Sequence, residues 1–95
     1  MTFKLKFDKR ALKEWRKLDA VVRDPFKKKL EERLKQPIVK SSRVSGAENC
    51  YKIKLKAVGY RLVYQVINDE VVVLVLAVGK RERNTVYKVA LNRVQ

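Results

Sequence analysis

The sequence contains no histidine and only one cysteine, and both shortages exclude classes of chemistry. Without imidazole there can be no serine–histidine triad, no histidine general base and no histidine-ligated zinc site. Because Cys50 stands alone, no disulfide can form within the chain, which favours a reducing compartment. We therefore expect no metal and no cofactor, so that any chemistry must use lysine, arginine, tyrosine or carboxylate groups.

Long hydrophobic segments are missing as well. The longest apolar run spans residues 71–78, whereas a membrane-spanning helix needs about 20 apolar residues. The N-terminal residues alternate Phe3, Leu5 and Phe7 with lysines, a pattern unlike that of a signal peptide. We therefore expect a cytoplasmic protein that does not enter the membrane.

Acidic residues are scarce, since 10 Asp and Glu face 24 Lys and Arg and leave a net charge of +14. This excess indicates a polyanionic partner such as nucleic acid, a ribonucleoprotein, an acidic protein or an anionic membrane surface. The 95 residues, 46 % of them hydrophobic, fit one domain over residues 1–95 with a core of its own.

The first half of the chain predicts a strand and two helices. Residues 2–7 alternate with a period of two, and Asp8 can cap the helix that follows. Pro25 either begins a second helix or lies inside a longer one, and the continuity of the apolar stripe favours the longer helix, which Pro37 ends. The apolar stripes of the two helices are Ala11, Leu12, Trp15 and Leu18, and Val22, Phe26, Leu30 and Leu34.

The second half predicts three strands and a short helix. After a loop at 37–49, residues 50–56 and 60–67 alternate, and residues 71–78 are apolar on both faces, as in a central strand. Residues 79–84 read as a charged loop before a C-terminal helix, whose apolar stripe is Val86, Val89, Ala90 and Val94. The order β-α-α-β-β-β-α predicts an α+β fold with an antiparallel sheet of about four strands. Because the two N-terminal helices cover one face, we expect the other face to carry the function.

Cationic side chains gather on that other face. Lys52, Lys54 and Lys56 point to one side of one strand, and Arg61 lies near them across the hairpin. A row of lysines also occurs on strands that simply face solvent. Like charges across a hairpin are unfavourable without an anion, however, so the pattern favours phosphate binding.

Several segments closely resemble the RelE family of messenger RNA interferase toxins, which belong to bacterial type II toxin–antitoxin systems. The resemblance covers essentially the whole chain and implies a microbial-ribonuclease-like fold. It also implies a ribosome-dependent endoribonuclease that cleaves messenger RNA in the ribosomal A site and inhibits translation. The segments are FDKRALKEW (7–15), CYKIKL (50–55), GYRLVY (59–64), VGKRER (78–83) and Val86–Tyr87.

The resemblance assigns roles residue by residue. Lys52 and Lys54 stand where the family has catalytic lysines, and Arg61 where it has a phosphate-binding arginine. Arg81 matches the arginine that stabilises the transition state or the leaving group, and Tyr87 the tyrosine that stacks on the cut nucleotide.

Four further cations complete the expected RNA-binding surface, and the middle loop departs from the family pattern. Family members often place a basic residue before the loop glycine, where this chain has Ser45, and Arg43 is the nearby residue that could compensate. The expected RNA or phosphate contacts are Arg43, Lys56, Lys80 and Arg83. Lys27, Lys28 and Lys29 read equally well as a solvated helix face or as contacts to ribosomal RNA.

The reaction itself suits a site without histidine. RNA is cut when its 2′-hydroxyl attacks the adjacent phosphate, which needs a base and stabilisation of the charged transition state. A lysine with the usual pKa of about 10.4 is protonated at neutral pH, but neighbouring cations lower the pKa. Lys54 lies between Lys52 and Lys56, so we expect a lowered pKa there.

The resemblance also implies partners and leaves two other functions open. The partners are the messenger RNA, the small-subunit ribosomal RNA and an acidic RelB-like antitoxin, with operator DNA bound only through the antitoxin complex. One alternative is a non-catalytic superfamily relative that poisons DNA gyrase. The other is a plain RNA-binding or ribosome-associated protein that uses its charge for affinity.

Overall fold

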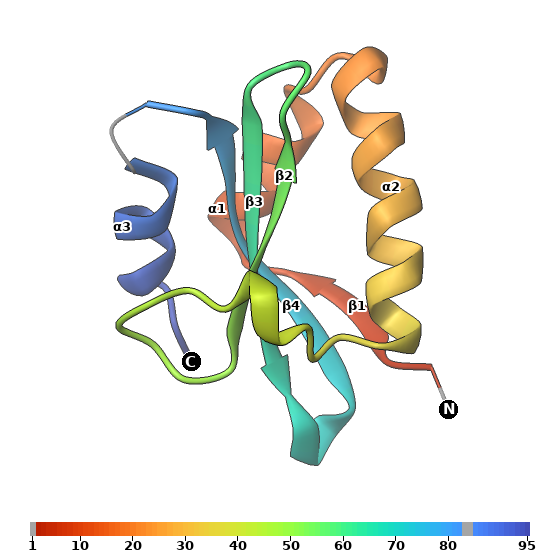
Figure 1. The fold of residues 1–95 in the computed structure, drawn as a ribbon, viewed down its shortest axis with the longest axis vertical. Coiled ribbons are helices and arrows are strands. Elements are labelled where there is room, and N and C mark those ends of the chain that lie inside the picture. Colours follow the sequence, from red (N-terminus) through yellow and green to blue (C-terminus); the bar gives the residue numbers. More distant parts are fainter. Residues whose placement is uncertain (1, 83–84) are drawn as a thin grey trace.

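The structure is a computed structural model that describes residues 2–82 and 85–95, and these residues form a four-stranded sheet and three α-helices (Figure 1). The predicted α+β class and element order are confirmed, and short 3-10 turns lie at Lys40–Ser42 and Asn68–Glu70. Arg83, which we expected to contact RNA, lies outside the described residues. The elements are β1 (Lys4–Phe7), α1 (Lys9–Arg16), α2 (Ala20–Lys35), β2 (Cys50–Leu55), β3 (Tyr60–Ile67), β4 (Val72–Lys80) and α3 (Thr85–Leu91).

The sheet is mixed, with strand order β1-β4-β3-β2. β2, β3 and β4 form the expected antiparallel meander, and β4 is an inner strand between β3 and β1. The expectation of a purely antiparallel sheet was wrong at one edge, because β1 pairs with β4 in parallel. Short turns force neighbouring strands to run antiparallel, whereas the two helices that follow β1 give a connection long enough for a parallel pair.

Local signals in the sequence account for both N-terminal helices. Asp8 caps α1, since its carboxylate accepts a hydrogen bond of 2.9 Å from the Arg10 backbone N–H. α2 runs through Pro25 as one long helix, as the stripe predicted, and ends just before Pro37. In the described parts of the chain, no helix is long and apolar enough to cross a membrane.

Helices cover both faces of the sheet. α1 and α2 enclose the main core on one face, where the Trp15 ring packs in tilted contacts against Phe7 and Phe26 at centroid distances of 5.4 and 6.3 Å. Burial of one such aromatic ring stabilises the fold by about 1.5–3 kcal/mol. α3 packs on the opposite face through the buried Val86 and Ala90 (Figure 1). Only the part of this second face that α3 leaves open can therefore carry a site.

β4 is longer than its apolar run. Gly79 and Lys80, which we expected in a loop, continue the strand because they pair with Arg61 and Tyr60 of β3. A Cβ atom on Gly79 would lie 3.1 Å from Cγ2 of Val86, so a glycine here lets α3 approach the strand closely.

Candidate functional site

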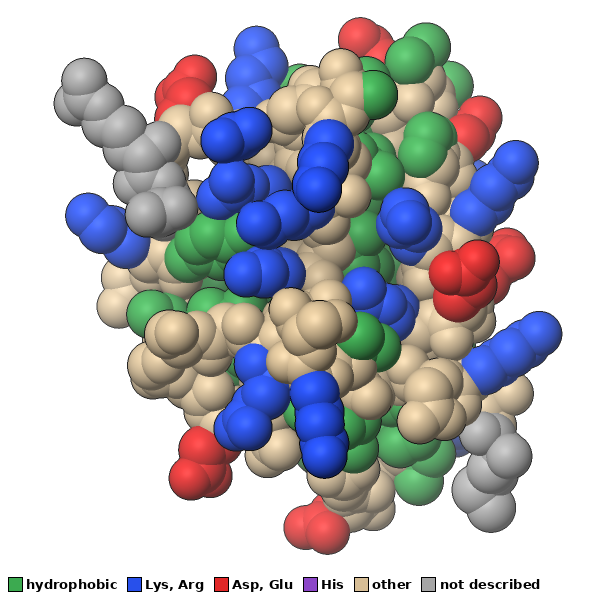
Figure 2. Space-filling view, in the orientation of Figure 1, with side chains coloured by type: hydrophobic (Ala, Val, Ile, Leu, Met, Phe, Trp, Pro, Cys, Tyr) green, Lys and Arg blue, Asp and Glu red, His purple; other side chains and the backbone are tan. Residues whose placement is uncertain are grey.

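Four cationic side chains line one pocket beside the turn of the β2–β3 hairpin. Lys54 of β2 lies directly opposite Arg61 of β3 in the antiparallel register. The pocket has a volume of about 340 Å³, and its charged lining residues are Lys54, Lys56, Arg61 and Arg81. In Figure 2 the Lys and Arg side chains gather over the middle of the face shown, while Asp and Glu lie nearer its margin. We call these four residues the basic pocket.

The hairpin turn brings Arg81 to the basic pocket. Gly59 adopts a φ of +68°, a left-handed conformation that favours glycine, and its backbone N–H donates to the Leu55 carbonyl at 2.9 Å. The Gly59 carbonyl in turn accepts a hydrogen bond of 2.7 Å from the backbone N–H of Arg81. The residue after β4 is thereby fixed to the turn between β2 and β3, although the two are far apart in sequence.

The electrostatics of the basic pocket act most clearly on Lys54. Its pKa is lowered, chiefly by the positive charge of Lys52, and further by desolvation, Arg61, Lys56 and Arg81. This is the direction that the sequence predicted, because like charges disfavour a protonated amine. The basic pocket therefore combines strong attraction for a phosphate with one amine that loses its proton more readily than an ordinary lysine.

Tyr87 occupies a second hollow next to the basic pocket. The hollow has a volume of about 280 Å³ and is lined by Arg43, Val44, Ser45, Lys52, Tyr87 and Lys88. Lys52 Nζ lies 5.8 Å and Arg61 Cζ 5.1 Å from the centroid of the Tyr87 ring, so both cations contact its π system. Arg61 also lines the basic pocket, so this one side chain borders both the Tyr87 ring and that pocket.

Tyr87 is less exposed than its position off the apolar stripe of α3 suggested. The ring is half-buried against the second core, and the hydroxyl is buried without a hydrogen-bond partner among the described residues. A buried polar group without a partner is rare in proteins and often has a functional reason. Because the hydroxyl is shielded, a ligand in the hollow would meet the exposed part of the ring and not the hydroxyl.

Arg33 supports the site from behind, and the sequence analysis missed it. Its guanidinium donates to the Lys52 carbonyl at 3.3 Å and to the Tyr64 hydroxyl at 2.8 Å. The Tyr64 hydroxyl donates to the Pro37 carbonyl, in the loop after α2, at 2.7 Å. These hydrogen bonds connect α2 and its following loop to β2 and β3 beneath Lys52. The available signal was position, because Arg33 follows Leu30 by three residues on the buried side of α2.

The remaining predicted residues lie outside the basic pocket. Lys80 is exposed and lines a different hollow, together with Glu14 and Val86, so the structure does not bring it into the basic pocket. Arg43 is exposed and reaches the Tyr87 hollow. No group of three acidic or cysteine side chains suited to a metal occurs within 2–82 and 85–95. The candidate ribosomal RNA contacts are all exposed on α2, and these are Lys27, Lys28 and Lys29.

Comparisons with known proteins find relatives along essentially the whole chain. Residues 5–85 match the family model of the ParE toxin of the type II toxin–antitoxin system parDE. The mRNA interferase toxin RelE of Escherichia coli K12 is 55 % identical over 94 residues, which are 99 % of each chain. An RelE-like toxin protein of Escherichia coli is 47 % identical over the full length of both chains.

Solved structures of the Escherichia coli toxin have the same fold. A double arginine-to-alanine variant of RelE in the free state superposes with a TM-score of 0.91 at 53 % identity, with all of both chains covered. RelE in the intact RelBE toxin–antitoxin complex superposes with a TM-score of 0.82 at 57 % identity, covering 85 % of this chain and 99 % of that one. The chain therefore belongs to the RelE toxins, within the ParE toxin family of type II toxin–antitoxin systems.

Proposed function

We propose that the chain is the toxin of a type II toxin–antitoxin pair and a ribosome-dependent endoribonuclease that cleaves messenger RNA in the ribosomal A site. The observation that carries the proposal is the meeting of Lys54, Arg61 and Arg81 in one pocket, with Tyr87 in the adjoining hollow. The full-length similarity to an mRNA interferase toxin supports the substrate. Such an enzyme would act in the cytoplasm, where messenger RNA is translated.

In the proposed reaction the scissile phosphate lies in the basic pocket. The neutral form of Lys54 accepts the proton of the 2′-hydroxyl, and the 2′-oxygen forms a bond to phosphorus. Arg61 and Arg81 stabilise the additional negative charge of the phosphorane. The bond to the 5′-oxygen then breaks, and that oxygen takes up one proton, either from the now protonated Lys54 or from water. The products are a 2′,3′-cyclic phosphate on one fragment and a 5′-hydroxyl on the other.

The ring of Tyr87 is proposed to position the nucleotide. Aromatic rings bind unstacked RNA bases by stacking, and each such contact contributes about 1–3 kcal/mol. An incoming base would replace one of the two cation contacts that the ring makes to Lys52 and Arg61. The cation displaced from the ring, Lys52 or Arg61, would then turn toward the phosphate on the same strand of RNA.

Substitutions of Tyr87 should separate its ring from its hydroxyl. We expect Tyr87→Ala to lower the single-turnover cleavage rate by about 10–100-fold, because stacking on the ring is lost. Tyr87→Phe keeps the ring and should stay much closer to the unmodified chain. The measurement is cleavage of messenger RNA on programmed ribosomes. Equal losses in both variants would show that the buried hydroxyl carries the effect instead.

The enzyme should cut free RNA poorly. The chain has no histidine pair to serve as acid and base, so catalysis would depend on a substrate already held in the reactive geometry, and the ribosome would hold it. Proximity and orientation can contribute about 7–11 kcal/mol to a reaction. We expect cleavage of a given messenger RNA to be faster by several orders of magnitude on programmed ribosomes. Equal rates with and without ribosomes would contradict this expectation.

An acidic RelB-like protein is the proposed antitoxin, in line with the RelBE complex of the Escherichia coli relative. The net charge of +14 favours an acidic partner, which would cover the cations that otherwise meet RNA. Operator DNA would be bound only through this complex. Displacement of α3 would inhibit the toxin, because Tyr87 moves with that helix.

One alternative comes from the family model itself, which is described as a ParE toxin. A gyrase poison would act through protein contact and would not need the basic pocket. Induction of the chain, followed by mapping of messenger RNA 5′ ends and by an assay of DNA damage, distinguishes the two functions. Cuts at defined codon positions support the nuclease, and DNA damage supports the gyrase poison. The absence of both cuts and damage supports a plain RNA-binding protein.

A further inference from the structure

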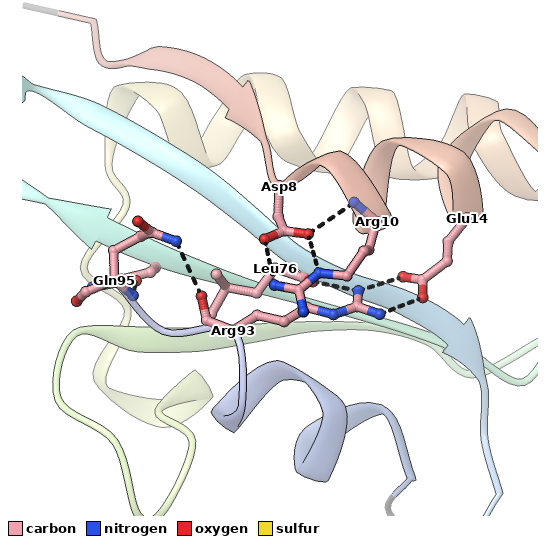
Figure 3. Close-up of polar contacts among 7 residues, drawn as sticks. Asp8, Arg10, Glu14, Leu76, Arg93 and Gln95 are labelled. Carbon is pink, nitrogen blue, oxygen red and sulfur yellow. Dashed lines mark hydrogen bonds and ion pairs between the residues drawn. The ribbon is translucent and has the colours of Figure 1, made fainter.

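An ion pair beyond the C-terminal end of α3 connects the last residues of the chain to α1. Arg93, two residues beyond the end of α3, donates from Nη1 to Glu14 Oε1 and from Nη2 to Glu14 Oε2, each at 3.0 Å (Figure 3). The pair is bidentate, the geometry in which arginine and carboxylate bind most strongly. The Arg93 side chain is only 11 % exposed and the Glu14 side chain 33 %, so the contact is partly shielded from solvent.

The same two side chains bind a stretch of β4 that has no neighbouring strand on the β1 side. β1 pairs with β4 only as far as Val75, and a β-bulge in the β3–β4 register leaves Leu76 without a partner residue on β3. Arg93 Nη1 donates to the Leu76 carbonyl at 2.9 Å, and Glu14 Oε1 accepts from the Val78 N–H at 3.2 Å. The ion pair is therefore anchored in the sheet and does not merely join two surface side chains. We call Glu14, Arg93 and these two backbone groups the latch.

α3 needs such an anchor to keep a defined position. It has seven residues, whereas isolated helices shorter than about 12–15 residues are marginal in water. Beyond the helix, Gln95 exchanges two hydrogen bonds with the side chain of buried Gln65, at 2.9 and 3.1 Å. The C-terminal end of α3 is thus held by the latch and by this pair.

Tyr87 belongs to α3, the helix that the latch holds. It lies in the first turn of α3, and its contacts to Lys52 and Arg61 depend on how that helix docks on the sheet. Glu14 and Arg93 do not line the basic pocket or the Tyr87 hollow. Any effect they have on cleavage is therefore indirect, and α3, which carries Tyr87, is the site element that Arg93 directly follows.

We propose that Glu14 and Arg93 are positioning residues, which hold α3 so that the Tyr87 ring stands beside Lys52 and Arg61 in the reactive arrangement. The inference rests on the proposed function for its catalytic consequence. Its structural part, the dependence of the Tyr87 contacts on the latch, stands apart from any activity.

The central experiment replaces Arg93 by methionine in the full chain. We expect the single-turnover rate on ribosome-bound messenger RNA to fall by roughly 10–100-fold, since displacement of a positioning group by about 1 Å can cost 10²-fold. The concentration of ribosome complex at half-maximal rate should stay the same. The matched control is Arg10→Met, because Arg10 forms an ion pair of equal length, 3.0 Å, but with Asp8 beside it in sequence. This control should stay within about twofold of the unmodified chain.

A double-substitution cycle tests whether Arg93 acts through Tyr87. In the Tyr87→Ala background, Arg93→Met should change the rate by less than about twofold, because the group that the latch positions is gone. NMR gives a readout without activity, namely the ring-current shift of the Lys52 side-chain methylenes near Tyr87. We expect this shift to shrink in Arg93→Met at temperatures where the variant is fully folded, and to persist in Arg10→Met.

The possible outcomes separate the latch from the proposed function. If Arg93→Met behaves like Arg10→Met, or loses as much activity without Tyr87 as with it, the positioning role is wrong. If the unmodified chain does not cleave, the proposed function is wrong, and the NMR comparison still decides on the latch. Should Arg93→Met fail to fold, Glu14→Gln and Arg93→Lys, which preserve side-chain size, replace it. Arg93→Lys should recover only part of the rate, because an ammonium cannot bind both Glu14 oxygens and the Leu76 carbonyl in the same geometry.

Discussion

Replacement of Lys54 by arginine is expected to lower the single-turnover cleavage rate by about 10²–10⁴-fold, the usual contribution of a general base. Arginine keeps the positive charge in the basic pocket, but it does not lose a proton near neutral pH. The neighbouring cations, chiefly Lys52, lower the pKa of Lys54 and so favour its neutral form. An arginine at this position would stay protonated beside the same cations. Binding of RNA should be almost unchanged, so the loss should fall on the rate constant and leave the half-saturating concentration alone.

The pH profile gives the sharper test of Lys54. In the unmodified chain the rate should rise with pH, because the neutral amine is the active form. The lowered pKa moves this rise toward lower pH than an ordinary lysine would give. Lys54→Ala and Lys54→Arg should both flatten it. Lys6→Arg, an exposed position on β1 at the opposite edge of the sheet, is the matched control. A normal rate for Lys54→Arg would mean that Lys54 only anchors the phosphate and that the base is Lys52 or ribosomal RNA.

The periodicity of the sequence was sufficient to predict the elements of this fold but not the partners of every strand. In β2, apolar Tyr51, Ile53 and Leu55 alternate with lysines, which defines both a strand and its buried face. Periodicity carries no information about the neighbour of a strand or its direction. The parallel pairing of β1 with β4 could therefore not be derived from residues 2–7 alone. Short connections carry that information, which is why the meander was predicted correctly.

The candidate site, too, has features that local sequence patterns predict and features that they do not. The approach of Lys54 and Arg61 followed from a short hairpin, since its turn sets the register of both strands. Gly79 and Lys80 were misplaced in a loop, because a charged residue at the end of a strand looks like a turn residue. The bond between Glu14 and Arg93 joins residues 79 positions apart, so no local pattern could report it. Contacts of this kind decide where α3 docks.

Arg81→Ala should lower the single-turnover rate at saturating toxin by about 10²–10³-fold, as the loss of one preorganised donor to a developing charge does in other enzymes. The backbone of Arg81 is fixed by its hydrogen bond to Gly59, and its side chain lines the basic pocket with Lys54 and Arg61. It is one of 24 cationic residues, so its removal changes the overall attraction for RNA very little. The loss should therefore appear in the transition state and not in binding.

The pH profile of Arg81→Ala should keep its shape and shift slightly toward higher pH. Arginine does not titrate in the accessible range, so the variant still contains the same base. Arg81 is nevertheless among the cations that lower the pKa of Lys54, although the weakest of them, and its removal lets that pKa rise a little. The matched control is Arg16→Ala, which also removes one positive charge. Arg16 is exposed at the end of α1 and is far in sequence from the residues of the basic pocket. If Arg81→Ala weakened binding and left the maximal rate intact, Arg81 would hold the substrate without stabilising the transition state, and that stabilisation would rest with Arg61 and the ribosome.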